Sequence, residues 1–412
     1  MNNISSTTAS SKRKEGSAPT VAKKLTFTIL SISLLTVMAG AAIAPALGVI
    51  KDYFSSCSDM LIQLIVSIPA LFIILTNLLF PFVSKKMGSK TIAIVGLVMY
   101  VAFGAGAFFC KDIWTLLVLR ALLGVSVGLI MPLSTGLLSF YFPPEKQPSL
   151  MGLSAAMNQL GGVVATLLAG LLANIHWNLA FLVYLLGLVA LVAVLLILPN
   201  ERLGREGGDG GKLSASPLAI LRRFHPSVTG MFILMLTFFV YPTNFALVAR
   251  NLTEMGGNAI TVVMVLLDVV AFLVGLVFGK MMERCPHQMK YVAPVLFLGG
   301  YLLMSWEAVA SWGLIAGSML VGLANGVGVP YLNTIASMKA GKSAATTVMP
   351  FLSAALYLGQ FVSPLIVLPL GSVLFPESGC APFRVGVILS AIFLVQMFLT
   401  RRFQVVTATK ED

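Results

Sequence analysis

A short motif occurs twice in the chain, 198 residues apart. Residues 81–90 read PFVSKKMGSK, and residues 279–288 read GKMMERCPHQ. Two further groups recur at the same spacing: Gly124, Gly128 and Pro132 return as Gly322, Gly326 and Pro330, and Leu160, Gly161 and Val164 return as Leu358, Gly359 and Val362. Several positions that share one spacing indicate that one half of the chain is a duplicate of the other.

The composition indicates what kind of half is duplicated. The chain is 58% hydrophobic and 10% charged, whereas about a quarter of the residues of a soluble protein are charged. A bilayer-spanning helix takes about 20 apolar residues. Apolar runs of that length cover residues 25–48, 61–80, 91–110, 113–137, 150–173, 179–198, 227–249, 258–281, 291–310, 312–334, 346–370 and 383–400. The sequence therefore predicts an all-α membrane protein with twelve transmembrane helices in two pseudo-symmetric six-helix halves.

The polar stretches predict the boundaries of the halves. Residues 1–22 are rich in Ser, Thr, Asn and Lys, which predicts a disordered cytoplasmic tail. Residues 23–199 form the N-terminal half, and residues 200–225 form a glycine-rich, charged linker on the cytoplasmic side. Residues 226–401 form the C-terminal half, and residues 402–412 form a second cytoplasmic tail.

The basic residues predict the orientation in the membrane. Of the 27 Lys and Arg residues, Arg120 lies inside an apolar run, and the loops on one side contain only Lys51, Lys111, Arg250 and Arg384. Cytoplasmic loops carry the excess of Lys and Arg, so both termini are expected in the cytoplasm. The net charge of +12 is then topological and requires no nucleic-acid partner. We expect a monomer in the cell membrane, and the short loops favour a bacterial inner membrane.

Two patterns that could suggest other chemistry are not supported by their context. The cysteines Cys57, Cys110, Cys285 and Cys380 are too isolated to bind a metal, and they leave open either a Cys57 to Cys110 bridge or free buried thiols. Residues 124–128 match the hydrolase motif Gly-x-Ser-x-Gly. That motif requires a strand followed by a turn and a helix, and here it lies within an apolar helix. No catalytic residue, metal or cofactor is predicted.

The motifs together resemble those of the major facilitator superfamily. They are the charged loops after spans 2 and 8, Arg120 and Gly124 in span 4, and Gly161-Gly162 in span 5. The segments AGAAIAPALGVI and LVLRALLGVSVG are most similar to the twelve-helix drug and proton antiporter branch. The resemblance implies a proton-coupled secondary transporter that works by alternating access and exports a small organic compound.

The loop motif departs from the family pattern in its first copy. Pro81, Lys85 and Lys86 stand where the family has Gly, Asp and Arg, while Gly88 matches. The second copy keeps the glycine, the acid and the arginine of the pattern. The resemblance therefore implies that gating relies mainly on the second copy, and the gating candidates are Lys86, Gly88, Gly279, Glu283 and Arg284. The alternative for the lysines is that they only anchor the topology.

Two ionisable groups are predicted well inside the membrane, Arg120 and Asp268. A charge there is costly, so both are expected to face the bundle interior. Arg120 matches the span 4 arginine that the family links to proton coupling, while its repeat mate is Ser318. We expect Asp268 and Arg120 to couple transport to protons. The alternatives are a static pair that holds the halves together, or an Arg120 that reaches outward to the membrane surface.

The candidate substrate site consists of amides and tyrosines within the spans. Hydrocarbon cannot satisfy their polar groups, and Met and Phe around them would suit an amphipathic organic molecule. Asn158 or Gln159 could instead form a bond between helices. Pro45 and Pro242 are predicted bending points. The substrate candidates are Asn158, Gln159, Tyr241, Asn244, Asn325, Tyr357 and Gln360.

The direction of transport is not specified by these residues. The chain could export an amphipathic compound. Alternatively, it could be a symporter or a facilitator that takes up a small organic anion, and Arg120 would then bind the carboxylate of that anion. A membrane-embedded enzyme would need clustered nucleophiles or metal ligands in the spans, and a sensor would need a soluble output domain. The sequence contains neither.

Overall fold

The computed structural model describes residues 18–142, 147–200, 217–285, 287–306 and 310–400, and every regular element within them is a helix. The expected tails and most of the expected linker lie outside these ranges. The first half contains α2 (Ala18–Thr36), α3 (Met38–Ala41), η1 (Ala44–Ala46), α4 (Leu47–Tyr53), α5 (Asp59–Lys86), α6 (Ser89–Gly106), η2 (Ala107–Phe109), α7 (Ile113–Tyr141), α8 (Gln147–Ala173), η3 (Trp177–Leu186) and α9 (Gly187–Ile197). The second contains α10 (Pro217–Phe238), α11 (Val240–Leu252), α12 (Gly257–Arg284), α13 (Met289–Met304), α14 (Ala310–Leu374) and α15 (Ala381–Leu399). The helix α10 begins inside the expected linker.

The helices have the length and composition of membrane spans. Among the described residues, 11 helical stretches are long and apolar enough to cross a bilayer, and α13 is a shorter apolar helix of 16 residues. The helix α14 contains two of these stretches, Ser311–Ala336 and Phe351–Leu374. The prediction of an all-helical membrane protein is confirmed.

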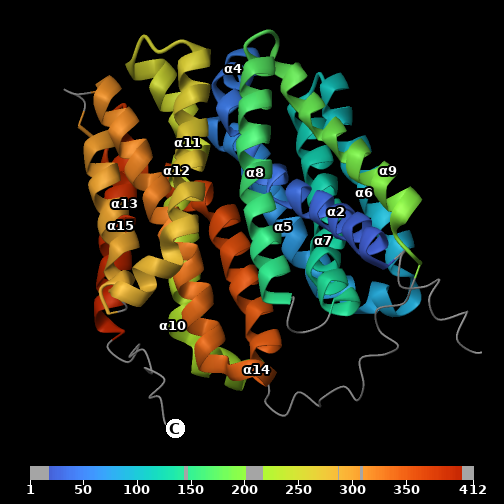
Figure 1. Cartoon of the computed structure of the whole chain (residues 1–412). Helices are drawn as coiled ribbons and strands as arrows, with labels where there is room; N and C mark the ends of the chain where they lie inside the picture. The colour runs from blue at the N-terminus through green and yellow to red at the C-terminus, as the bar shows by residue number, and fades with distance from the viewer. Residues whose placement is uncertain (1–17, 143–146, 201–216, 286, 307–309, 401–412) are drawn as a thin grey trace, which may run out of the picture.

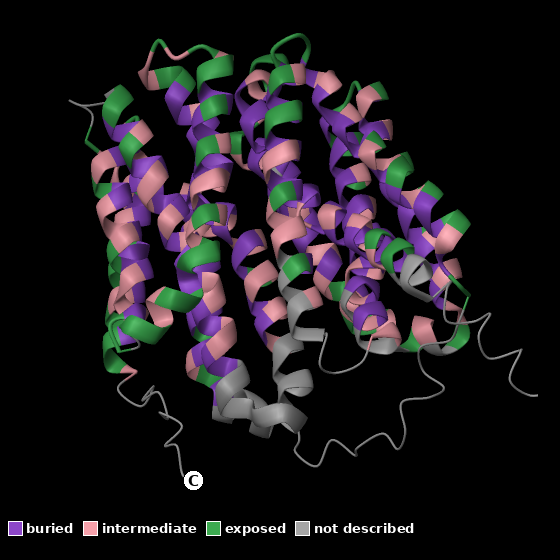
Figure 2. Cartoon of the chain, in the orientation of Figure 1, coloured by how far each residue is buried: buried purple, intermediate pink, exposed green. Residues whose placement is uncertain are grey.

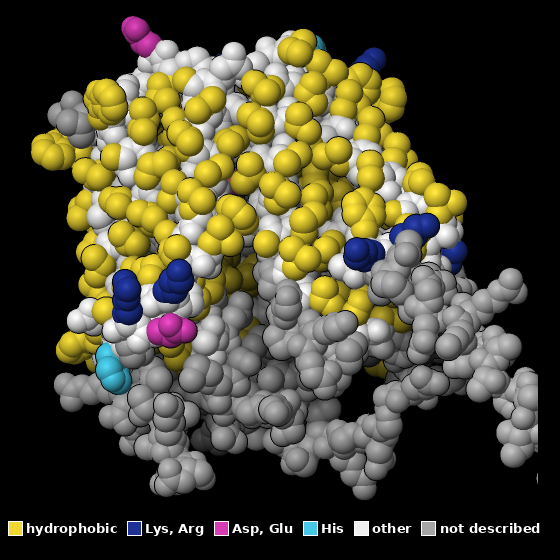
Figure 3. Space-filling model, in the orientation of Figure 1, with side chains coloured by type: hydrophobic (Ala, Val, Ile, Leu, Met, Phe, Trp, Pro, Cys, Tyr) yellow, Lys and Arg dark blue, Asp and Glu magenta, His cyan; other side chains and the backbone are white. Residues whose placement is uncertain are grey.

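The outer surface is apolar between two charged ends. Large side chains such as Leu196, Phe109 and Trp312 are each 79% exposed, and most helices in Figure 2 have buried residues on one side and exposed ones on the other. Figure 3 shows a broad hydrophobic belt with the charged side chains gathered toward its two ends. Such a belt is what a protein surrounded by lipid requires.

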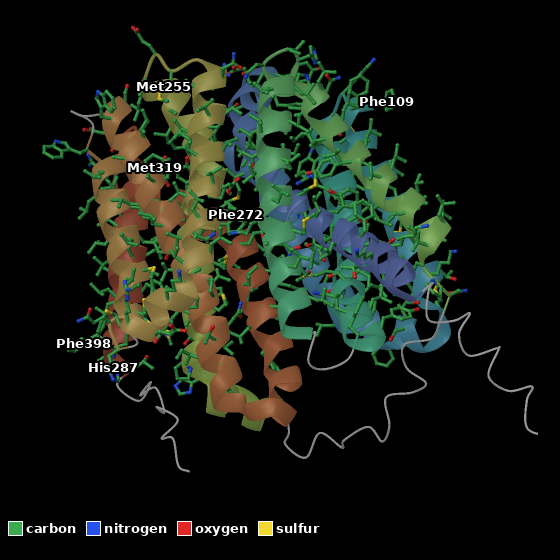
Figure 4. The ribbon with its side chains drawn as sticks, in the orientation of Figure 1. Phe109, Met255, Phe272, His287, Met319 and Phe398 are labelled. Atoms are coloured by element: carbon green, nitrogen blue, oxygen red, sulfur yellow. The ribbon has the colours of Figure 1, made fainter. Side chains whose placement is uncertain are left out.

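The two ends of the bundle are named as follows. The termini face is the end at which α2 begins and α15 ends, and the far face is the opposite end, formed in part by residues 54–58 and 253–256. In Figure 4, Met255 lies at the far face and His287 at the termini face.

Glycines at repeat-related positions bring the helices of each half close together. A Cβ atom on Gly322 would lie 2.6 Å from the carbonyl oxygen of Leu267, and one on Gly124 would collide with the carbonyl oxygen of Pro69. Two further pairs of contacts between a glycine and a backbone carbonyl correspond between the halves in the same way. They are Gly128 with Ile73 and Gly326 with Ala271, and Gly161 with Leu34 and Gly359 with Phe232. In each case the glycine and its partner in the second half lie 198 residues after their counterparts in the first half, so the two halves repeat their packing as well as their sequence.

Spans 1 and 7 are interrupted near their prolines. The helix α10 ends at Phe238 and α11 begins at Val240, just before Pro242. Pro242 has no N–H to offer the carbonyl of Phe238, and the hydroxyl of Tyr301 approaches that region by donating to the carbonyl oxygen of Thr237 at 2.6 Å. Span 1 is likewise divided into α2, α3, η1 and α4, with Pro45 inside η1. The apolar run expected at 25–48 is therefore not one continuous helix.

The two halves meet closely at the far face. Arg250 of α11 forms an ion pair with Asp52 of α4. The side-chain amide of Asn174, which directly follows α8, donates to the side-chain oxygen of Asn258 in the first turn of α12 at 2.7 Å. These two helices lie side by side at the centre of Figure 1. The described conformation thus has its far face closed by contacts between the halves.

Candidate functional site

Arg120 is fully buried inside the first half. Its exposed fraction is 0%. Nε donates to the carbonyl oxygen of Ile65 at 2.7 Å, Nη1 donates to the hydroxyl of Tyr184 at 2.6 Å, and Nη2 donates to the carbonyl oxygen of Ala39. All of these partners are neutral, so the positive charge of the guanidinium has no carboxylate counterion among them.

Two of the partners of Arg120 are backbone carbonyls at irregular points of their spans. In α5, the carbonyl of Ile65 would normally accept from the N–H four residues on. That residue is Pro69, which has no N–H. Ala39 lies in α3, directly before the interruption of span 1. Arg120 therefore supplies a donor to the carbonyl that Pro69 leaves unpaired within α5, and another to a carbonyl at the interruption of span 1.

Asp268 lies on the other side of the boundary between the halves. It is eleven residues into α12, which is roughly 16 Å of helix, and Phe272, one turn further on, lies near mid-height in Figure 4. The hydroxyl of Thr166 in α8 donates to its carboxylate oxygen at 3.0 Å. Asp268 is therefore a mid-membrane carboxyl group that contacts both halves.

Arg120 and Asp268 are not paired in this conformation. The ion pairs between described residues are those of Lys51 with Asp59 and of Arg250 with Asp52. A static Arg120 to Asp268 pair and an outward-reaching Arg120, the two alternatives considered from the sequence, are both absent. Arg120 also does not line an open site from which it could bind a carboxylate directly.

The predicted substrate residue Asn244 takes part in a contact between the halves. Nε2 of Gln63 in α5 donates to Oδ1 of Asn244 in α11 at 2.6 Å, and both residues are buried. Nδ2 of Asn244 donates to the carbonyl oxygen of Val240 at 2.9 Å and to the hydroxyl of Thr243 at 3.0 Å. We name the Gln63 to Asn244 bond, together with the Asp52 to Arg250 and Asn174 to Asn258 contacts, the far-face latch.

Two further candidates bridge the halves near mid-membrane. Nε2 of Gln360 lies 3.4 Å from the carbonyl oxygen of Val66, and the hydroxyl of Tyr357 lies 3.1 Å from the sulfur of Met131. Both candidates belong to α14 and reach toward α5 and α7 of the first half. The structure therefore places them at the boundary between the two halves.

The remaining candidates have different surroundings. Oδ1 of Asn158 accepts from the hydroxyl of Thr36 at 3.1 Å, which is a bond between helices of the first half, and its neighbour Gln159 is partly exposed. Tyr241 is buried with its ring stacked on Phe245 at 4.6 Å. Oδ1 of Asn325 is buried and has no hydrogen-bond partner in the described part of the chain.

The predicted gating residues lie at the termini face. Gly88 packs beside the Asn200 side chain. Lys86, Gly279, Glu283 and Arg284 are exposed, and a Cβ on Gly279 would meet nothing within 4 Å. Neither Glu283 nor Arg284 takes part in an ion pair between described residues. The side chain of Lys85 lies outside the described residues.

Three residues that contact the candidates were not predicted from the sequence. They are Gln63, which joins Asn244, Tyr184, which joins Arg120, and Thr166, which joins Asp268. Gln63 could have been found, because an amide inside the apolar run 61–80 needs a partner. Tyr184 and Thr166 carry no comparable signal. The four cysteines are free, and within the described ranges no three His, Cys, Asp or Glu side chains could hold a metal.

Comparison with known proteins identifies similar sequences. The sequence profile described as Major Facilitator Superfamily matches residues 29–364. The hexuronate transporter of Bacillus subtilis (strain 168) is 25% identical over 108 residues, which is 26% of this chain and 26% of that relative's length. The match to this relative thus spans about a quarter of each protein.

Solved structures share the fold over nearly the whole chain. A bacterial homolog of the human lysosomal transporter Spinster, in an inward-facing and occupied conformation, has a TM-score of 0.70 at 16% identity, covering 93% of this chain and 97% of that one. The nucleoside transporter NupG has a TM-score of 0.71 at 12% identity, covering 91% and 98%. A D-xylose-proton symporter has a TM-score of 0.71 at 15% identity, covering 90% and 97%.

Proposed function

The chain belongs to the major facilitator superfamily and is a secondary transporter, and from this premise we propose that it takes up a small organic anion together with a proton. The observation that carries the proposal is the burial of Arg120 among neutral partners. A buried guanidinium without a counterion makes the interior of the first half electropositive. At an effective dielectric constant of about 20, a carboxylate about 10 Å from it would be attracted by about 1.7 kcal/mol. Arg120 thus favours an anion without touching it.

The names of the related proteins favour uptake over the export that the resemblance to the antiporter branch implied. One relative is named a hexuronate transporter, a sugar acid being a small organic anion, and a structural neighbour is named a D-xylose-proton symporter. These names support the anion-uptake alternative of the sequence analysis better than membership of the drug and proton antiporter branch.

Asp268 supplies a simple means of coupling. When ionised, it repels an anion that enters between the halves, and when protonated it does not. An anion would therefore bind well only after Asp268 has taken up a proton, and both would cross together. Its contact with Thr166 lies at the boundary between the halves, where alternating access changes the surroundings. Gln360, Tyr357 and Asn325 would contact the substrate.

The sidedness of the proposal follows from the basic residues. If the lysine-rich and arginine-rich termini face is cytoplasmic, the closed far face is the outer one. The described conformation is then inward-facing, and breaking the far-face latch opens the transporter to the outside. Glu283 and Arg284 would act in that second conformation, because in this one they form no ion pair with any residue that the structure describes.

Transport by the purified protein in liposomes tests the function. With an acidic exterior, we expect accumulation of labelled D-glucuronate above its equilibrium level and little accumulation of D-glucose, and collapse of the pH gradient with an ionophore should abolish the accumulation. A matched Asp268→Asn preparation should only equilibrate the anion. Proton-driven movement of hydrophobic cations in the opposite direction would overturn the proposal in favour of export.

A further inference from the structure

A recess opens at the far face between the two halves. It holds about 240 Å³ and is formed by α5, α11, the end of α14 and the turn that leads into α15. Its floor consists of Gln63, Asn244 and Val367, all of which are buried. The recess lies on the far side of the Gln63 to Asn244 bond from the mid-membrane candidates, and it is therefore a separate space.

The floor has an unused hydrogen-bond acceptor. Asn244 donates with Nδ2 to the carbonyl oxygen of Val240, which has no hydrogen to give, so its Oδ1 must be the atom that faces Gln63. Gln63 must then present Nε2 to it, and Oε1 of Gln63 is left without a partner in the described part of the chain. A hydroxyl of a ligand in the recess could be the donor that this oxygen lacks.

The walls are polar without net charge. The carboxylate of Asp59 lines the recess and is neutralised by Nζ of Lys51 at 2.8 Å. Asn251 and Ser372 add further polar groups, while Leu247 and Phe375 supply apolar surface. A ligand with several hydroxyl donors and a carbon–hydrogen face would satisfy both kinds of wall, whereas a carboxylate would find no Lys or Arg among the described residues that line the recess.

We propose that this recess is a second ligand site, distinct from the central one, for a neutral polyhydroxylated molecule of monosaccharide size. Pockets for drug-sized ligands hold roughly 300–1,000 Å³, so a space of about 240 Å³ suits a smaller molecule. The buried, unpaired Oε1 of Gln63 accepts one hydroxyl, and the rim groups bind others. The ring face packs on the apolar wall.

The position of the site links it to the transport cycle. Gln63 and Asp59 come from the first half, and the other walls come from the second. The recess therefore exists only while the far face is closed, and a ligand that binds only one conformation shifts the population toward it. Occupancy stabilises the closed far face and slows opening to that side.

A pair of glycine variants tests the site without disturbing the latch. Gly371 lines the recess, and a Cβ there has only ordinary contacts, the nearest at 3.5 Å, so Gly371→Leu should fold and fill the space. Gly275 on α12 is exposed with nothing within 4 Å of a Cβ, so Gly275→Leu is the matched control. Gln63→Leu removes the acceptor itself.

Binding of myo-inositol, D-glucose and D-glucuronate to the purified full chain is measured by calorimetry and by thermal shift. We expect the wild type and Gly275→Leu to bind the neutral polyols, Gly371→Leu and Gln63→Leu to bind at least tenfold more weakly, and D-glucuronate to bind this site more weakly than D-glucose. Polyols also stabilise proteins by exclusion from their surface. Binding to the recess is therefore measured as the difference between the thermal shift of the wild type and that of Gly371→Leu.

Failure of this inference can be told from failure of the proposed function. No binding of neutral polyols by the wild type, or equal binding by Gly371→Leu, would overturn the recess site whatever is transported. The central site is expected to have the opposite preference, for D-glucuronate over D-glucose. It is tested by uptake into liposomes, whereas the recess is tested by binding to Gly371→Leu. Each result therefore bears on one site.

Discussion

Nε2 of Gln63 lies 2.6 Å from Oδ1 of Asn244, and this bond joins the two halves beneath the far face. Above it the carboxylate of Asp52 meets the guanidinium of Arg250. Both contacts must break before the far face can open. The far-face latch therefore sets part of the free-energy difference between the two conformations.

The Asp52 to Arg250 pair should bias the conformation modestly. Its side chains are 57% and 34% exposed, and exposed pairs contribute about 0.2–1 kcal/mol. We expect Asp52→Asn to raise the far-face-open population up to about fivefold, and the swap Asp52→Arg with Arg250→Asp to restore it. Distances between spin labels at positions 111 and 377 measure the population. A swap that opens the far face more than the single variant does would contradict the pairing.

Arg120 and Pro69 should be coupled in stability. Arg120→Leu leaves the carbonyl of Ile65 buried without a donor, and each such group costs about 1–3 kcal/mol. Pro69→Ala restores the missing N–H in α5, so it should recover part of the loss in the Arg120→Leu background and have a smaller benefit in the wild type. Thermal unfolding of the four variants in detergent forms the cycle. Strict additivity would show that the two residues act independently.

Asp268→Asn should separate coupling from transport. The amide keeps the size of the side chain and can still pair with Thr166, but it cannot bind and release a proton. We expect loss of accumulation against a gradient with exchange of substrate across the membrane retained. Thr166→Val is the control, since it loses the 3.0 Å bond but keeps the carboxyl group, and it should still accumulate substrate. Full proton-driven accumulation by Asp268→Asn would rule out this residue as the coupling site.

The two copies of the loop motif should differ in importance. Only the second copy has an acid beside a base, as Glu283 and Arg284, and both side chains are exposed in this conformation. We expect Glu283→Gln to reduce the transport rate at least tenfold and Lys85→Ala to reduce it less than twofold. Rates in liposomes at equal protein density provide the comparison. Equal losses would mean that the copies share the gating.

The cysteines report the orientation. Cys57 is half-buried at the far face, and Cys285 is exposed at the termini face. In single-cysteine variants in intact cells, an impermeant maleimide should label Cys57 and spare Cys285 until the membrane is permeabilised. The opposite pattern would invert the topology.

The thiol of Cys110, just beyond the end of its span, provides a pH test at the far face. Burial raises its pKa, and the nearby Asp112 carboxylate raises it further. Labelling of Cys110 should therefore be slow near neutral pH and accelerate as the pH rises. Asp112→Asn should lower the pKa and speed labelling at a given pH, and asparagine is as good as aspartate at the start of a helix. An unchanged rate would show that access alone limits the reaction.

The helical architecture and the internal packing could be predicted because they depend on local patterns. Apolar run length predicts a span, and the spacing of Gly124 and Gly322 predicts where backbones touch. Pro45 and Pro242 predicted the regions in which spans 1 and 7 are interrupted, since a missing N–H acts on its own helix. These features need no knowledge of a distant partner.

The partners of the polar residues could not be predicted in the same way. The sequence suggested Arg120 and Asp268 as a pair, yet each bonds elsewhere, because the orphan carbonyl left by Pro69 is a nearer acceptor for Arg120. Asn244 was expected to bind substrate, and the sequence did not predict that in this conformation its oxygen accepts from Gln63. Which side chains meet across the halves depends on how each helix is rotated about its own axis. A span that is apolar on all sides does not indicate this rotation.

The glycine contacts within each half have a mechanical consequence. Where backbone rests on backbone, as at Gly322 with Leu267 and Gly326 with Ala271, no side chain can change rotamer to absorb a displacement. Each half then moves as one stiff body. The helix α12, with 28 residues, is about 42 Å long, so a tilt of about 10° moves one of its ends by about 7 Å relative to the other. A rotation this small is enough to open or shut a passage for a molecule the size of a sugar.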